Sequence, residues 1–173
     1  MPLSLYSATV PRFLQILGSV ATLIDKGEAF AGERGLAPAD IIGAQLAPDM
    51  LPFAYQVKAT AEHSLGAIEG VRQGVFSPSM AAPPDSFEGL RGKVAEARVA
   101  LKAIDAAEID AFVGRDMCFE MRDMRLEFMA EDFLLSFSMP NFYFHAATAY
   151  DILRAKGVKL GKIDFLGRLA LKG

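Results

Sequence analysis

The sequence contains one cysteine, Cys118, and two histidines among its 173 residues. A single cysteine excludes an internal disulfide and is typical of a protein that folds in a reducing compartment. Cys118 lies between Met117 and Phe119 in an alternating apolar segment. That setting favours packing over catalysis, because a catalytic thiol needs a nearby histidine and a positive environment. We therefore expect a cytoplasmic protein with no covalent cross-link.

Long runs of one kind of residue are scarce as well. The most apolar stretch, residues 13–24, is shorter than the roughly 20 residues of a spanning helix and includes polar and small side chains. Lysine and arginine are scattered and the net charge is −3, which argues against a nucleic-acid partner. The first ten residues carry no Lys or Arg, so we expect no signal peptide. The expected protein binds neither nucleic acid nor a membrane.

Apolar residues, by contrast, are abundant. They make up 52% of the chain, slightly above the usual share of about 45–50%. A chain of this length buries enough surface to form a core without cross-links. We expect one domain over residues 1–173, with some apolar surface left for a partner or for the lining of a cavity.

Four segments have apolar residues at the three-four spacing of an amphipathic helix. The clearest runs from Phe87 through Leu101 to Ile104, and Asp85 followed by Glu88 predicts its start. Residues 74–84 carry three prolines and are predicted to be a loop. The last helix contains Pro140, which predicts a kink or bulge there. The helices are expected at about residues 4–35, 52–71, 85–104 and 131–156.

Residues 117–128 change to an alternating apolar pattern, which is typical of strands. A two-residue turn at Arg122 and Asp123 would pair Glu120 with Arg125 and, on the other face, Phe119 with Leu126. One register therefore satisfies both faces. The sequence predicts a mainly α protein, a four-helix bundle with a small β-hairpin before its last helix.

Polar side chains interrupt two of the helices. Gln56, Thr60 and His63 follow one another at helical spacing beside small residues, and Asn141 and His145 lie four apart just after Pro140. We expect these groups to converge on one polar pocket between the second and last helices. Simpler roles remain open: His145 as a half-buried imidazole bonded to a neighbouring helix, and Asn141 as an amide that satisfies backbone groups freed by Pro140.

Four stretches of the sequence resemble a known family: Pro140-Asn141-Phe142-Tyr143-Phe144-His145, Leu46-Ala47-Pro48-Asp49-Met50, Ser4-Leu5-Tyr6 and the segment Gly161–Gly167. The family is bacterial and fungal, the domain-of-unknown-function family nineteen ninety-three. That family looks like a branch of the DinB/YfiT-like superfamily of four-helix bundles, often described as metalloenzymes. The resemblance implies an up-down-down-up order of helices.

In the wider superfamily one histidine on the second helix and two on the last bind a divalent metal. Carried over by position, the ligands here would be His63, Asn141 and His145, with Asn141 and Ser136 standing where relatives often have histidine. Zn²⁺ or Ni²⁺ would then be held weakly, because an amide oxygen is a poor transition-metal ligand. The expected pocket lining is Gln56, Thr60, Ser136, Tyr143 and Thr148.

Two classes of function follow. The first is a small-molecule-binding protein or a metal-dependent transferase or hydrolase with its site between the second and last helices. The second is a non-catalytic, stress-associated helical bundle that forms a homodimer through its apolar surplus, for which residues 133–144 offer material. The sequence names neither a substrate nor a reaction.

Overall fold

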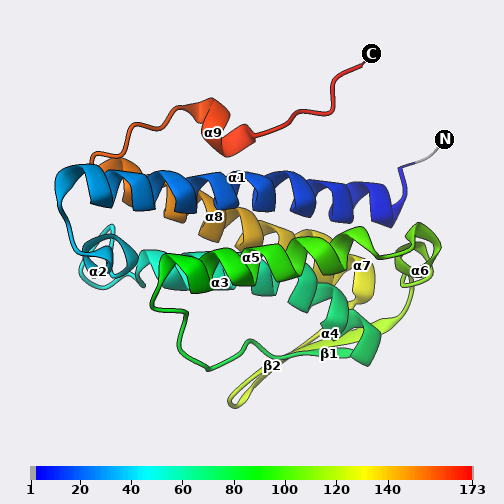
Figure 1. Cartoon of the computed structure of the whole chain (residues 1–173). Coiled ribbons are helices and arrows are strands. Elements are labelled where there is room, and N and C mark those ends of the chain that lie inside the picture. The colour runs from blue at the N-terminus through cyan, green and yellow to red at the C-terminus, as the bar shows by residue number, and fades with distance from the viewer. Residues whose placement is uncertain (1–2, 173) are drawn as a thin grey trace.

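The computed structural model describes residues 3–172 and is mainly helical, with a small three-stranded sheet (Figure 1). The single domain expected over 1–173 includes residues 1, 2 and 173, which lie outside the described residues. Four long helical segments pack lengthwise against one another. They are α1 (Leu5–Arg34), the continuous run α3 (Phe53–Ala61), η1 (Glu62–Gly66) and α4 (Ala67–Gln73), α5 (Phe87–Lys102), and the run α7 (Ala130–Asp132), η2 (Phe133–Ser138) and α8 (Met139–Ala155).

Helix α1 begins where its sequence supplies a cap. Ser4 accepts from the backbone N–H of Ser7, and Gly35 ends the helix in a left-handed conformation at φ 63°. By length and hydropathy α1 is also apolar enough to cross a membrane. Half of its most apolar window is buried against the other helices, as in the core helix of a soluble protein, so this is weak evidence for a membrane.

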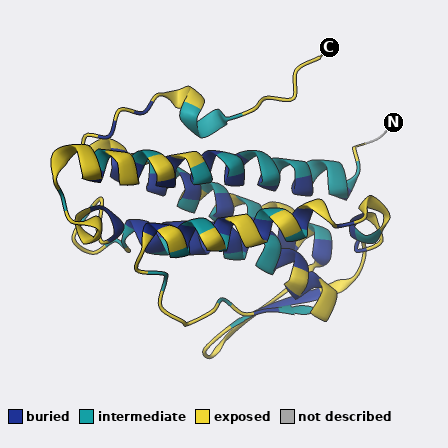
Figure 2. Ribbon diagram, viewed as in Figure 1, coloured by how far each residue is buried: buried dark blue, intermediate teal, exposed yellow. Residues whose placement is uncertain are grey.

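Helix α5 lies alongside α1 and buries the predicted stripe. Phe87, Leu90, Val94 and Leu101 are all buried, and the opposite face is exposed (Figure 2). The start of α5 corrects the sequence prediction by one residue. Ser86, not Asp85, is the N-cap, and its hydroxyl accepts from the Gly89 N–H.

The hairpin has the predicted register. Strands β2 (Asp116–Met121) and β3 (Met124–Met129) are antiparallel, with Glu120 opposite Arg125 and Phe119 opposite Leu126. The predicted loop 74–84 is wrong at its start, because β1 (Val75–Phe76) pairs parallel with β2. The sheet therefore has three strands, and β1 joins the hairpin to the end of the second helical run.

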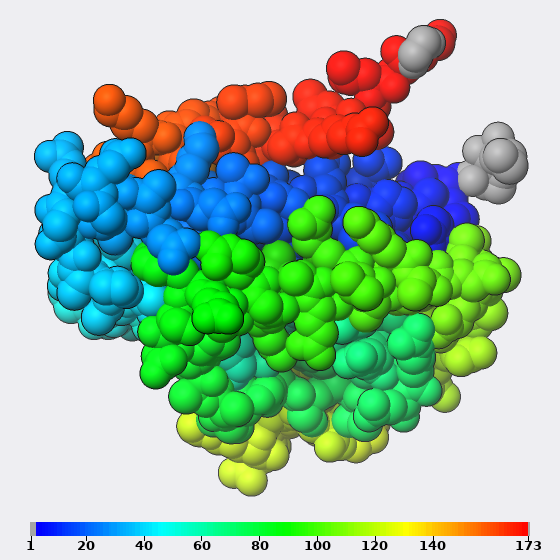
Figure 3. Space-filling view, in the orientation of Figure 1, coloured from blue at the N-terminus to red at the C-terminus, as the bar shows by residue number. Residues whose placement is uncertain are grey.

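The short elements close the two ends of the bundle. Helices α2 (Pro38–Ile42) and α6 (Ala106–Asp110) follow α1 and α5, and Ile41 and Ile109 are fully buried. After α8, the chain turns back and α9 (Lys162–Leu166) lies along α1 (Figure 3). Phe165 stacks edge-on against Tyr150 at 6.1 Å between ring centroids.

Candidate functional site

Two π-helical turns face each other in the bundle. One, η1, carries His63; the other, η2, ends at Ser138, two residues before Pro140. The bulge expected near Pro140 is thus present as a π-helical turn. A π turn inserts one extra residue into a helix and so redirects the side chains around it. Here η1 was not expected from the sequence, and it turns His63 toward the last helix.

Four polar side chains connect the two helical runs in a crossed pattern. His63 Nδ1 lies 3.3 Å from Ser138 Oγ, and His145 Nδ1 lies 2.7 Å from Gln56 Oε1. Each run thus contributes one histidine and, seven residues away, one polar partner for the histidine of the other run. Seven residues are about two turns, so both pairs lie on the facing sides of antiparallel helices.

The hydrogen-bond network assigns the tautomers of both rings. Ser138 Oγ donates to the backbone oxygen of His63, so it can only accept from Nδ1–H of that ring. The amide of Gln56 donates to Leu51 O, which leaves its Oε1 to accept from Nδ1–H of His145. Both histidines therefore carry a proton on Nδ1 and a lone pair on Nε2. Within residues 3–172 neither Nε2 has a hydrogen-bond partner.

The two imidazoles are stacked, with centroids 5.7 Å apart and planes inclined by 16°. Aromatic rings surround them: Phe76 and Phe137 lie 5.5 and 6.0 Å from His63, and Tyr55 lies 5.9 Å from His145. Burial in this setting lowers the pKa of both histidines to about 4, and for His63 the neighbouring His145 adds a smaller effect. At neutral pH both rings are uncharged, the form that binds metals.

The other predicted site residues lie elsewhere or bond locally. Asn141 donates from its amide to Phe137 O, 2.7 Å away on its own helix. The hydroxyls of Thr60 and Thr148 likewise bond the carbonyl four residues earlier, and Ser136 is exposed and bonds Asp132 O. Tyr143 is half-buried against Phe142. Of the expected lining, only Gln56 bonds one of the two histidines.

Sequence analysis missed Ser138, although a signal was present. Ser138 lies seven residues before His145, as Gln56 lies seven before His63, and it is the only hydroxyl in 137–140. Its side chain is fully buried and its Oγ makes both bonds to His63.

Two histidines alone fit a metal only partly. Both Nδ1–H groups are held by second partners, as is usual for metal-ligating histidines, and both Nε2 lone pairs are free to ligate. No group of three or more His, Cys, Asp or Glu suited to a metal occurs in the described residues. Glu62 pairs with Lys58 at 3.4 Å and Glu131 accepts from Gly114 N, so each has another partner. The residues fit a weak two-nitrogen site completed by water or ligand.

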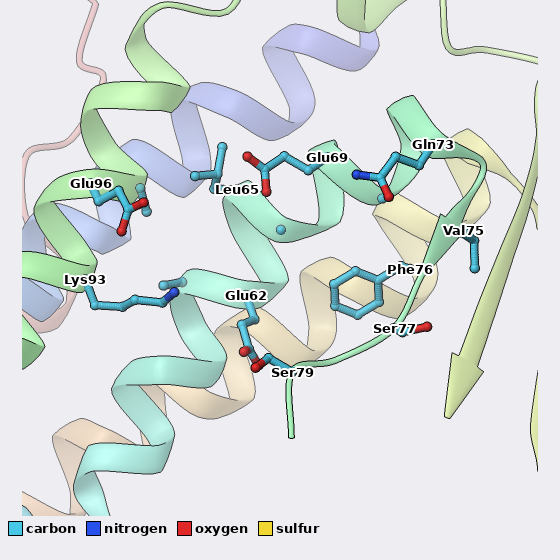
Figure 4. A pocket seen from close by; sticks show the side chains of 14 residues that line it. Glu62, Leu65, Glu69, Gln73, Val75, Phe76, Ser77, Ser79, Lys93 and Glu96 are labelled. Carbon is cyan, nitrogen blue, oxygen red and sulfur yellow. The ribbon is translucent and has the colours of Figure 1, made fainter. Parts of the chain in front are cut away.

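A separate cleft of about 380 Å³ opens beside η1, between α4, β1 and α5 (Figure 4). Its lining includes Glu62, Glu69, Glu96 and Lys93, and burial raises the pKa of Glu62. Neither histidine lines it. Phe76 does, and the same ring lies 5.5 Å from His63, so the cleft and the histidine pair share one aromatic wall.

The fold is that of a mainly helical, DinB-like protein. The structure resembles the crystal structure of a DinB family member protein from Shewanella denitrificans, with a TM-score of 0.81 and 25% identity, covering 98% of this chain and 95% of that one. Residues 5–166 match the domain of unknown function DUF1993, and the chain belongs to that family. No curated protein matches the sequence.

Proposed function

We propose that this protein is a small-molecule-binding DinB-like protein that holds a divalent metal through His63 and His145. The observation that carries the proposal is the pair of stacked, neutral imidazoles whose Nδ1–H groups are fixed by Ser138 and Gln56. Because Nδ1 of each ring is held by a hydrogen bond, Nε2 of each ring is the atom left to ligate a metal. Zn²⁺ or Ni²⁺ suits imidazole nitrogen.

With two protein ligands, most of the coordination shell is left to water or substrate. An open shell is what catalytic metal sites have, whereas structural sites are closed by four protein ligands. When bound, the metal would supply Lewis-acid activation of water or of a thiol, which supports a transferase or hydrolase. The chain's part is to hold two neutral rings in place and to exclude bulk water with Phe76, Phe137 and Tyr55.

The experiment is a calorimetric titration of the metal-stripped protein with Zn²⁺ and with Ni²⁺. We expect one weak site, which the double variant His63→Ala, His145→Ala lacks. Ser138→Ala and Gln56→Ala keep both ligands and should weaken binding about 10–100-fold by freeing the rings. Equal binding by wild type and double variant would refute the metal site. Circular dichroism of each variant checks that it is folded.

A second candidate is a non-catalytic homodimeric bundle, the up-down-down-up scaffold with its chemistry lost. Apolar side chains on the hairpin favour it: Met121, Met124 and Leu126 are 38%, 49% and 39% exposed. The stretch 133–144 offers less, since within it only Leu135 and Phe144 are exposed large apolar residues. A metal-free dimer in light scattering that Met124→Lys converts to a monomer would support this function; a monomeric wild type would exclude it.

A further inference from the structure

A second hollow lies on the opposite side of the molecule from the hairpin, between α1, α5 and the C-terminal segment. Figure 3 shows this segment lying on α1, with α5 along the other side of α1. The groove has a volume of about 780 Å³. Its lining includes Leu14, Ile163 and Leu169, so much of its wall is apolar. None of its lining residues belongs to the histidine site.

Positive charge gathers around this apolar wall. Arg12, Arg98, Lys102 and Arg168 all line the groove, and the one carboxylate there, Asp164, is paired with Lys26 at 2.7 Å. Within residues 3–172 none of these four cations has a carboxylate within 4.0 Å. Four unpaired cations in one groove are notable in a chain whose net charge is −3.

Some arginines outside the groove are paired. Arg91 lies two turns before Arg98 on α5 and contacts Asp25 at 2.9 Å, and Arg72 contacts Glu108 at 2.6 Å. Some arginines outside the groove thus lie opposite carboxylates, whereas none of the three arginines in its lining does so within residues 3–172. Like charges held together without a counter-charge repel one another, and an anionic ligand would relieve that repulsion.

Two buried polar atoms in the lining also lack a partner within the described residues: Ser19 Oγ and Arg98 Nε. Ser19 is 3% exposed, so water does not compensate for its missing hydrogen bond. The guanidinium of Arg98 lies over Gly18, where an added Cβ would be 3.9 Å from its Nη2. Arg98 and Ser19 thus each contribute one unpartnered polar atom to the residues that line the groove.

The C-terminal segment is fastened over α1 at two points. Gln15 Nε2 donates to Leu166 O at 2.8 Å, and Lys26 binds Asp164. Gly167 then passes so close to Ser19 that a Cβ there would lie 2.5 Å from its Oγ. The backbone of Gly167 also has a positive φ of 61°, a region that glycine adopts without steric cost. These contacts hold the C-terminal segment, which forms one wall of the groove, in a fixed position against α1.

We propose that this groove binds an organic anion with an apolar body. The carboxylate or phosphate group lies among Arg98, Lys102 and the other two cations and accepts hydrogen bonds from the guanidinium of Arg98. The apolar part lies along Leu14, Ile163 and Leu169. Charge-assisted bonds from guanidinium to carboxylate or phosphate are stronger than neutral ones and give such a site its selectivity.

The test is a calorimetric titration of the full chain at low salt with octanoate, octyl phosphate and octanol, which share one apolar tail. We expect at least one of the two anions to bind and octanol not to bind detectably; the better anion identifies the head group. Binding should weaken as salt is raised, because exposed charges are screened. Octanol binding as tightly as the anions, or no binding by either anion at millimolar concentration, would overturn the proposal.

A pair of matched variants separates the groove from overall charge. Arg98→Gln with Lys102→Gln should weaken anion binding about 10-fold or more, since it removes two charged contacts. Arg34→Gln with Lys156→Gln removes the same charge outside the groove and should leave binding unchanged. Equal loss in both double variants, or none in the first, would also overturn the proposal. The thermal transition of each variant shows that it remains folded.

Discussion

The pair α1 and α5 differs in kind from the pair formed by the second and last helical runs. Helix α5 is regular throughout, and its buried face is wholly apolar. The other two runs each contain a π-helical turn, and between them they hold every buried polar or charged side chain of the described residues except Thr9 and Ser19. Regular packing and buried polarity are thus kept in separate parts of one bundle.

The difference shows how a bundle can hold polar groups in its interior. A regular stripe such as that of α5 points the same face inward along its whole length and leaves polar side chains outside. A π turn breaks that phase and lets His63 and Ser138 meet inside the bundle. Buried polar groups are costly unless they are bonded, and here each histidine has a partner on the opposite run.

The largest effect of a single substitution is expected in the pair formed by α1 and α5. Leu101 is fully buried on α5, so Leu101→Ala should cost about 2–5 kcal/mol of unfolding free energy through lost burial and a residual cavity. Val99, 70% exposed on the same helix, is the control, and Val99→Ala should change stability by less than about 0.5 kcal/mol. Urea unfolding measures both. Similar values for the two variants would mean that α5 does not bury this stripe.

In the pair formed by the second and last helical runs, the buried histidines should make the free energy of unfolding depend on pH. The pKa of His63 and of His145 is about 4 in the folded protein, below the ordinary 6.5. The unfolded chain therefore binds more protons between these values, and stability falls as pH is lowered from about 6.5 to 4. The loss should reach the order of 3 kcal/mol for each ring.

Urea unfolding at pH 7, 5.5 and 4.5 measures this loss. The raised pKa of Glu62 acts in the opposite sense, so the reference is the double variant His63→Gln, His145→Gln, which keeps Glu62. We expect this variant to lose most of the decline that wild type shows. A wild type whose stability is flat over the window would show that the rings are not buried as uncharged imidazoles.

One glycine in α4, on the second helical run, and one in α5 allow the packing of the two helix pairs to be compared directly. A Cβ on Gly70 in α4 would lie 2.7 Å from Cβ of Phe76, whereas a Cβ on Gly92 in α5 meets nothing within 4 Å. Gly70→Ala should therefore cost about 1–3 kcal/mol through overpacking against β1. Gly92→Ala should add up to about 1 kcal/mol, because alanine favours a helix. Thermal unfolding of the two variants in parallel tests the opposite signs.

The sequence was sufficient for the elements whose pattern is local. The stripe of α5 and the register of Glu120 with Arg125 follow from spacing alone and are confirmed. Strand β1 was missed because two residues carry no period, and its pairing with β2 depends on contacts far along the chain. The same holds for the bond between His63 and Ser138, which joins residues 75 positions apart and depends on two π turns.

Asn141 illustrates the limit at the candidate site. Its spacing of four from His145 correctly places both on one helix, but spacing does not say which acceptor an amide will choose. In the structure the amide bonds the carbonyl of Phe137, one turn back, next to the carbonyl that Pro140 leaves without an N–H. The choice depends on the exact path of η2, which propensity does not determine.

The smallest effect is expected in the hairpin β2–β3, which pairs with β1 at the end of the second helical run. Its turn lacks the glycine or asparagine that tight hairpins prefer, and Arg122 adopts a left-handed conformation with φ 54°. Glycine reaches this region without the steric penalty of a Cβ, although it also loosens the unfolded chain. Arg122→Gly should therefore stabilise the protein by about 0.5–1 kcal/mol. Asp123→Gly, beside it with an ordinary φ, should stabilise nothing. A destabilised Arg122→Gly variant would mean that the Arg122 side chain, and not the turn, holds the hairpin in register.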